Sequence, residues 1–167
     1  YPDLVGSSYA SCFAIVHQRY STNTFPSWPL AQPFRYVAHN GEINTIRGNV
    51  SRIKAREKTI IAESSDPFHE MVMPVVNEKL SDSGCFDNVY ELLLRNGRSA
   101  PHTVMMMIPE PFSAEYHISQ DRRAFYQYHA ALMEPWDGPA ALVFTDGMMV
   151  GASLDRNGLR PARWTIT

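Results

Sequence analysis

The strongest constraint on the fold is a pair of short apolar runs joined by an Asp-Gly step late in the chain. The runs cover residues 140–145 and 148–153, with Asp146 and Gly147 between them. Asp-Gly between apolar runs is typical of a β-hairpin with a tight primed turn, because both turn residues tolerate positive φ. The sequence therefore predicts antiparallel strands rather than a helical bundle.

Three other segments are expected to be strands. Residues 9–20 are dense in aromatic and β-branched side chains, as in a buried strand, and residues 34–38 form a shorter run that ends at His39-Asn40-Gly41. A last strand is predicted from Leu159 onward. Residues 21–32 are rich in proline and predict a loop, which Phe25 and Trp28 would pack down.

Apolar residues spaced three or four apart predict helices elsewhere. The helical segments are residues 42–58, residues 86–94 with an Asn96-Gly97 stop, and residues 122–133. Residues 71–76 predict a short apolar element, and the Met-rich residues 102–108 predict core material. The sum is an α+β domain with antiparallel pairing. It carries neither GxGxxG after a strand nor GxxxxGK[ST], so nucleotide-binding motifs are lacking.

Length and charge narrow the class of function. The 167 residues suffice for one domain with a core, and the net charge of −2 comes from scattered residues, which argues against nucleic acid as a partner. No apolar run reaches the roughly 18 residues that span a bilayer. The six histidines lack ligand spacing, so no metal is expected, and two distant cysteines favour a reducing compartment. Both ends of the sequence look cut, which predicts a piece of a longer protein.

Three polar clusters, at residues 17–23, 39–42 and 81–83, could carry chemistry. The guanidinium of Arg19 suits a carboxylate, because its fork matches two oxygens. Asn40 beside the backbone N–H of Gly41 suits an oxyanion, and the Asp82 carboxylate suits an ammonium group. Together they would bind a zwitterionic amino acid. Taken singly, Arg19 also fits a surface charge, Asn40-Gly41 a simple turn, and Asp82 a helix cap.

Two long motifs carry a family resemblance. Residues 17–49, HQRYSTNTFPSWPLAQPFRYVAHNGEINTIRGN, and residues 128–163, YHAALMEPWDGPAALVFTDGMMVGASLDRNGLRPAR, resemble the glutamine amidotransferase domain of the glutamate synthase family, and SDSGCFDNVYELLLRNG also fits. The resemblance covers most of the chain. It implies one class II amidotransferase domain over residues 1–167, with the N-terminal nucleophile fold. That fold is a four-layer αββα sandwich of antiparallel sheets, here incomplete at the N-terminus.

The resemblance also implies roles by motif. Arg19 would bind the α-carboxylate of glutamine beside Thr22, and Asp82 would bind the α-ammonium. Asn40 and the Gly41 N–H would form the oxyanion hole. Asn23 stands where many relatives have His, and its contact with substrate is the least secure. The segment DRNGLRP, residues 155–161, is expected to shape the sheet edge near the site.

The nucleophile departs from the family pattern. Class II enzymes use a cysteine at the mature N-terminus, whose own α-amine acts as base. Here the first residue is Tyr1. Cys12 is expected to be a core thiol, and Cys85, near a helix start, is expected to be structural although its pKa could be lowered there. The sequence predicts that the nucleophile lies upstream and that the chain alone is inactive.

For the intact protein, the resemblance implies release of ammonia from L-glutamine and its reductive transfer to 2-oxoglutarate, yielding glutamate. The synthase domains of the same chain would use FMN and an iron–sulfur cluster. The electron donor, whether NADPH, NADH or ferredoxin, is left open. The expected location is the cytoplasm, or a plastid in a plant-like source. The alternatives are a non-catalytic glutamine-binding module and another class II amidotransferase, such as a purine or aminosugar enzyme.

Overall fold

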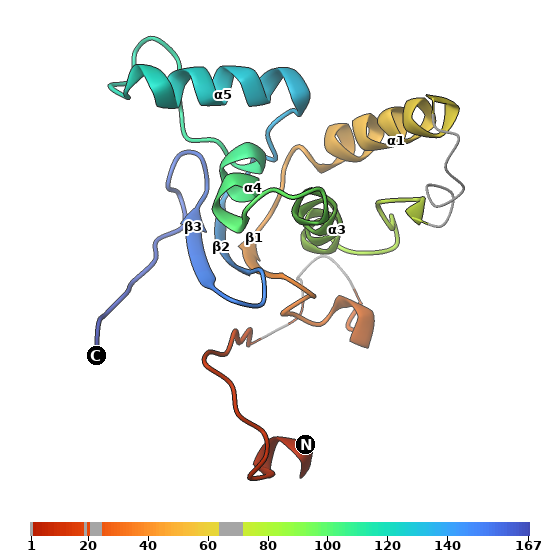
Figure 1. Ribbon diagram of the computed structural model, residues 1–167, viewed down its shortest axis with the longest axis vertical. Helices are drawn as coiled ribbons and strands as arrows, with labels where there is room; N and C mark the ends of the chain where they lie inside the picture. The colour runs from red at the N-terminus through yellow and green to blue at the C-terminus, as the bar shows by residue number, and fades with distance from the viewer. Residues whose placement is uncertain (1, 19, 21–24, 64–71) are drawn as a thin grey trace.

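The computed structural model describes residues 2–18, 20, 25–63 and 72–167. It contains a small three-stranded sheet with helices beside it (Figure 1). Strand β1 covers Val37–Gly41, β2 covers Ala140–Thr145 and β3 covers Val150–Leu154. All three pair antiparallel in the order β1-β2-β3. The expected α+β class with antiparallel pairing is confirmed.

The β2–β3 hairpin is confirmed, but its turn differs from the expected one. Thr145 pairs with Val150, so the loop holds the four residues 146–149 rather than two. Gly147 has a φ of 92°, whereas none of the described non-glycine residues has a positive φ, which rules out a turn with both central residues left-handed. Asp146 Oδ1 instead accepts the N–H groups of Met148 and Met149, each at 2.9 Å. That side chain stabilises a wider turn.

The described residues include four α-helices besides the sheet, and three of them were predicted. Helix α1 covers Ile46–Glu63, displaced by several residues from the expected 42–58. Helix α3 covers Asp82–Arg95, where the Ser81 hydroxyl accepts the Gly84 N–H and Gly97 follows at a φ of 85°. Helix α5 covers Gln120–Leu132. The Met-rich segment forms helix α4, Ala100–Met107, and Met106 and Met107 are buried as expected.

Helices α3 and α4 cover one face of the sheet (Figure 1). Successive side chains of a strand face opposite sides, and Leu142 and Phe144 of β2 lie on the helical side, both buried. Trp136, fully buried before β2, meets Phe86 of α3 edge-to-face with ring centroids 5.6 Å apart. The Trp136 N–H of the backbone donates to Met107 O at 2.7 Å, which ties the β2 entrance to the end of α4.

The opposite face of the sheet lacks a covering layer among the described residues. Asn40, Val150 and Leu154 lie on this open face, because they alternate with the buried positions of their strands. Val150 is 45% exposed and Leu154 is 38% exposed. An apolar sheet face of this kind is normally packed against another layer.

Several expected elements are corrected. Residues 9–18 form no strand, and neither do residues 159–167, where Trp164 is 86% exposed. A strand needs a neighbouring strand for its hydrogen bonds, and neither segment pairs with a strand among the described residues. Phe25 and Trp28 are exposed rather than packed, although residues Trp28–Leu30 form a short 3-10 helix. A second such helix covers Pro2–Val5.

The apolar element expected at residues 71–76 is not a regular one over residues 73–76, and residue 71 lies outside the described part. The first residues of the expected strand at 34–38 are also irregular, since β1 begins at Val37 and includes His39, Asn40 and Gly41. None of the described helices is long and apolar enough to cross a bilayer.

Candidate functional site

The structure brings two of the three polar clusters together. His39 of β1 has its Nδ1 atom 2.7 Å from Ser83 Oγ at the start of α3. The Ile43 N–H donates to Asp82 Oδ2, also at 2.7 Å. The end of β1, with Asn40 and Gly41, and the first turn of α3, with Asp82, therefore lie side by side.

The hydrogen-bond pattern of β1 decides where its amide groups face. Thr145 N donates to Tyr36 O at 2.9 Å before the strand. Glu42 N donates to Pro139 O at 3.0 Å after it. Because ladder bonds alternate along an antiparallel strand, the even-numbered residues bond β2, and the N–H groups of the odd-numbered residues face the outer edge.

Two side chains occupy that outer edge at the start and middle of β1. Asp87 Oδ1 accepts the Val37 N–H at 3.0 Å. It also accepts the N–H of Tyr36 at 2.9 Å, a residue that lies before β1 and departs from the alternation. Gln32 pairs with the backbone of His39 at both ends, accepting its N–H at 2.7 Å and donating to its carbonyl at 3.1 Å. The sequence did not predict these roles of Gln32 and Asp87. The backbone groups that they bond lie in another segment, so periodicity carries no signal for them.

Gly41 has the next outward-facing N–H, and no acceptor among the described residues bonds it. Of the outward-facing N–H groups on either side of it, that of His39 donates to Gln32 and that of Ile43 donates to Asp82. A backbone N–H without an acceptor, next to a carboxylate, can donate a hydrogen bond to a ligand oxygen at that point. This is the position expected for an oxyanion donor.

Gly41 is required at this position for a steric reason. Its φ is 146°, and a Cβ atom built there would lie 1.8 Å from Pro139 O. Gly138 has the matching constraint, with a φ of 152° and a Cβ position 1.9 Å from Glu42 O. The two chain segments therefore approach each other more closely than any side chain allows. The Asn40-Gly41 pair is thus part of a strand and a crossing, and not a simple turn.

Asp82 binds backbone with both carboxylate oxygens. Oδ2 accepts Ile43 N, and Oδ1 accepts Ser83 N at 2.7 Å. The N-cap of α3 is Ser81, so Asp82 is not the cap that the simplest interpretation suggested. A carboxylate has about four lone-pair positions, so a half-buried Asp82 retains room for an ammonium donor.

His39 is neutral in this setting. Burial lowers its pKa below the usual value, and the raising effect of the Asp82 carboxylate does not offset it. Arg160 lowers the pKa further. The site therefore contributes a neutral imidazole next to the Ser83 hydroxyl.

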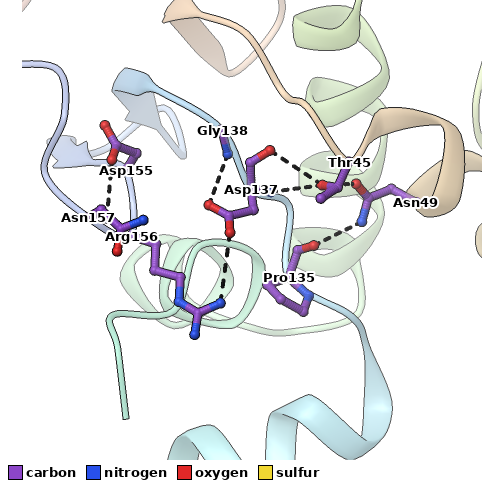
Figure 2. Close-up of polar contacts among 8 residues, drawn as sticks. All are labelled: Thr45, Asn49, Pro135, Asp137, Gly138, Asp155, Arg156 and Asn157. Atoms are coloured by element: carbon purple, nitrogen blue, oxygen red, sulfur yellow. Dashed lines mark hydrogen bonds and ion pairs between the residues drawn. The ribbon is translucent and has the colours of Figure 1, made fainter. Parts of the chain in front are cut away.

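Side-chain hydrogen bonds hold the loop before β2 against the start of α1 (Figure 2). Asn49 Nδ2 donates to Pro135 O at 3.0 Å, and Thr45 Oγ1 accepts Asp137 N at 2.9 Å. Asp137 Oδ1 in turn accepts Gly138 N at 3.0 Å. These contacts fasten the start of α1 to the loop that Gly41 touches.

Asp155 shapes the sheet edge, as expected for residues 155–161. It is buried, and desolvation raises its pKa, but hydrogen bonds from four backbone N–H groups outweigh that effect and hold the pKa below its usual value. The donors are Ala140, Asn157, Leu159 and Arg160. Arg156 extends from this turn to Asp137, with Nη1 3.8 Å from Oδ2 (Figure 2).

Asn40 lies on the open face of the sheet and is exposed. Its side chain and the Gly41 N–H thus flank the same strand end. The other expected substrate-binding residues, Arg19, Thr22 and Asn23, lie outside the described residues.

Neither cysteine has the surroundings of a nucleophile. Cys85 is buried, and desolvation, followed by Asp82 and Glu78, raises its pKa to about 11, against the lowered value that a helix start could have given. Cys12 is exposed, so its expected place in the core is wrong. Within the described residues, no group of three or more His, Cys, Asp or Glu side chains could hold a metal ion.

Known proteins are similar to this chain over its whole length. The family model described as class-II glutamine amidotransferases matches residues 1–167. The chain is 52% identical to an NADPH glutamate synthase large chain of Bacillus subtilis (strain 168), over 167 residues that are 100% of this chain and 11% of that relative. It is 51% identical to an NADH glutamate synthase of Saccharomyces cerevisiae, over 100% of this chain and 8% of the relative. A ferredoxin-dependent glutamate synthase of Pyropia yezoensis is 49% identical, over 100% and 11%. The chain thus spans about a tenth of the length of these curated relatives.

Proposed function

Since the chain belongs to the class-II glutamine amidotransferases, we propose that it is the glutamine-binding part of a glutamate synthase and releases ammonia from L-glutamine in the intact protein. The ammonia would be transferred reductively to 2-oxoglutarate by synthase domains of the same chain. The observation that carries the proposal is the outward N–H of Gly41 next to Asp82 and Asn40, which has no acceptor among the described residues.

The proposed chemistry follows from what these groups can do. Attack on the side-chain amide of glutamine places a negative charge on its oxygen, and two fixed donors, Asn40 Nδ2 and Gly41 N–H, would stabilise that charge. Asp82 would bind the α-ammonium. Arg19, with Thr22 and Asn23 near it, would bind the α-carboxylate, a role that rests on the motif.

We assign the attacking thiol to a cysteine outside residues 1–167. A thiol with a pKa near 11 is almost wholly protonated at neutral pH, which disfavours Cys85. The chain by itself would then bind glutamine without turnover. This keeps a second candidate, a non-catalytic glutamine-binding module, which a glutaminase assay of the complete subunit separates from the first. The identities to glutamate synthases disfavour a purine or aminosugar amidotransferase.

The open face of the sheet supports the four-layer αββα arrangement. In that fold a second antiparallel sheet packs on the first, and the apolar side chains of Val143, Val150 and Leu154 provide a surface for it. The nucleophile would then lie in the sheet opposite Asn40.

The remaining proposals concern the intact protein. We place FMN and an iron–sulfur cluster in other domains, since the described residues offer no set of ligands for a cluster. The relatives are named for NADPH, NADH and ferredoxin, so the electron donor stays open. We propose ferredoxin or a small electron-donating subunit as the partner that delivers the electrons. We place the protein in the cytoplasm, or in a plastid for a plant-like source.

Replacing Asn40 with Ala in the complete subunit tests the proposal. Loss of one oxyanion donor lowers kcat for glutamine hydrolysis by roughly 10²–10³-fold. Asn44→Ala is the matched control, because Asn44 is exposed, four positions along the chain and outside the proposed site. Ammonia release measures both variants. Equal rates for Asn40→Ala and wild type would remove Asn40 from the site.

A further inference from the structure

The side chains of Asn49, on α1, and Thr45, just before α1, connect this part of the chain to the 135–139 loop (Figure 2). Asn49 is 1% exposed, and both ends of its side chain are used. Nδ2 donates to Pro135 O at 3.0 Å, and Oδ1 accepts the Thr45 hydroxyl at 2.6 Å. The Asn49 side chain thus donates to the loop and accepts from Thr45.

Thr45 continues the connection to the loop. Its Oγ1 atom accepts Asp137 N at 2.9 Å while donating to Asn49. Its own backbone N–H donates to Asp137 O at 3.3 Å. One hydroxyl therefore joins the buried amide to the backbone of the loop, and its removal would leave Asp137 N without that acceptor.

The position of the loop decides the position of Gly41. Pro139 O accepts Glu42 N at 3.0 Å, and it lies 1.8 Å from the place where a Cβ of Gly41 would be. A Cβ atom built on Gly138 would likewise lie 1.9 Å from Glu42 O. With no free space between the segments, a displacement of the loop displaces the Gly41 N–H.

Helix formation does not account for Asn49. Asparagine has a low helix propensity, because its side chain competes for backbone hydrogen bonds. A buried helix position would ordinarily favour an apolar residue. The contacts of Asn49 with Pro135 and Thr45 supply the missing reason.

We propose that Thr45 and Asn49 are positioning residues of the oxyanion hole, which hold the 135–139 loop so that the Gly41 N–H keeps its direction. The inference rests on the proposed function, because the hole is part of it. Neither side chain touches the substrate. Their effect falls on the transition state, where the oxyanion exists, and not on the binding of glutamine.

Thr45→Val and Thr45→Ser in the complete subunit form a matched pair. Valine keeps the shape and removes the hydroxyl, whereas serine keeps the hydroxyl. We expect Thr45→Val to lower kcat for glutamine hydrolysis by about 10- to 100-fold, with KM within about 2-fold of wild type, as small misplacements of catalytic groups do. Thr45→Ser should stay close to wild type. Asn49→Asp, which keeps the acceptor for Thr45 and loses the donor to Pro135, is a second variant with the same kcat loss.

Hydrogen–deuterium exchange of peptides covering residues 36–46 gives a readout that does not depend on activity. Exchange should be faster in Thr45→Val and unchanged in Thr45→Ser. Wild-type kcat in Thr45→Val, or a loss that serine does not rescue, would overturn the inference. An inactive wild-type subunit would instead overturn the proposed function, while the exchange data would still show whether the hydroxyl holds the Gly41 segment.

Discussion

Three glycines near the end of β1 and the start of α1, Gly41, Gly138 and Gly48, differ in their structural effects. At Gly41 and Gly138 the backbone is left-handed and a Cβ would collide with a carbonyl oxygen of the crossing segment. At Gly48, in the first turn of α1, a Cβ would meet nothing within 4 Å. The first two are needed for the close approach that forms the site, whereas Gly48 only weakens its helix.

Gly48→Ala should therefore stabilise α1, by roughly 0.5–1 kcal/mol, because alanine loses less backbone entropy on folding. Amide exchange of α1 in the complete subunit should slow by about 2- to 5-fold, the equivalent of that free energy. Gly138→Ala is the contrasting variant, and exchange around residues 36–46 should become faster. Faster exchange of α1 in Gly48→Ala would contradict this assignment.

At the scale of elements, helices α4 and α5 meet through a histidine pair. His102 Nε2 lies 2.6 Å from His129 Nε2, and His129 Nδ1 lies 2.8 Å from Phe125 O. Since Nδ1 must donate to that carbonyl, His129 Nε2 is the bare acceptor and His102 Nε2 carries the proton between them. At least one of the two rings must therefore be neutral, because two protonated rings would have no acceptor between them.

The pair should make the α4–α5 contact sensitive to acid. Desolvation, then His129 and then Arg98 lower the pKa of His102 below its usual value. The unfolded chain thus takes up a proton near pH 6.5 that the folded state resists, so stability is present above that pH and is lost as the pH falls through it.

The measurement compares melting temperatures at pH 7.5 and 5.5. His102→Gln should lose less stability on acidification than wild type. His117→Gln, at an exposed histidine, serves as control and should follow wild type. Identical losses in His102→Gln and wild type would exclude the pair as the cause.

At the scale of the whole molecule, helices pack on one face of the sheet, and no layer covers the other face in the part of the chain that the structure describes. The helical face buries Leu142 and Phe144, while Val150 and Leu154 remain 45% and 38% exposed on the other. In the complete subunit we expect a second layer on this face, as the αββα arrangement requires.

Leu154→Glu in the complete subunit tests that layer. A charge buried without a partner should cost at least about 2 kcal/mol, or about 4–8 °C in Tm for a domain of this size. Met148→Glu is the control, because Met148 lies in the β2–β3 loop and is 90% exposed. A Leu154→Glu subunit that melts with the control would show that the face stays in water.

The sequence by itself determined what depends on neighbouring residues. Helices α3 and α5 and the β2–β3 hairpin were predictable, because a helix makes its hydrogen bonds within its own segment and a hairpin within a short one. The motif around Asn40 and Gly41 likewise identified the family and the expected roles. The motif also predicted Asp82 as a site residue. Its role in binding substrate stays a prediction.

Only the tertiary structure decided which partners those residues have. Residues 9–18 form no strand despite their composition, because strand hydrogen bonds come from other segments. The same dependence puts Gln32 and Asp87 on the edge of β1 and makes Asn49 a buried link to Pro135. It also leaves the Gly41 N–H without an acceptor among the described residues. The resemblance predicts an oxyanion hole at Asn40 and Gly41, and contacts between distant segments fix the geometry of that strand end.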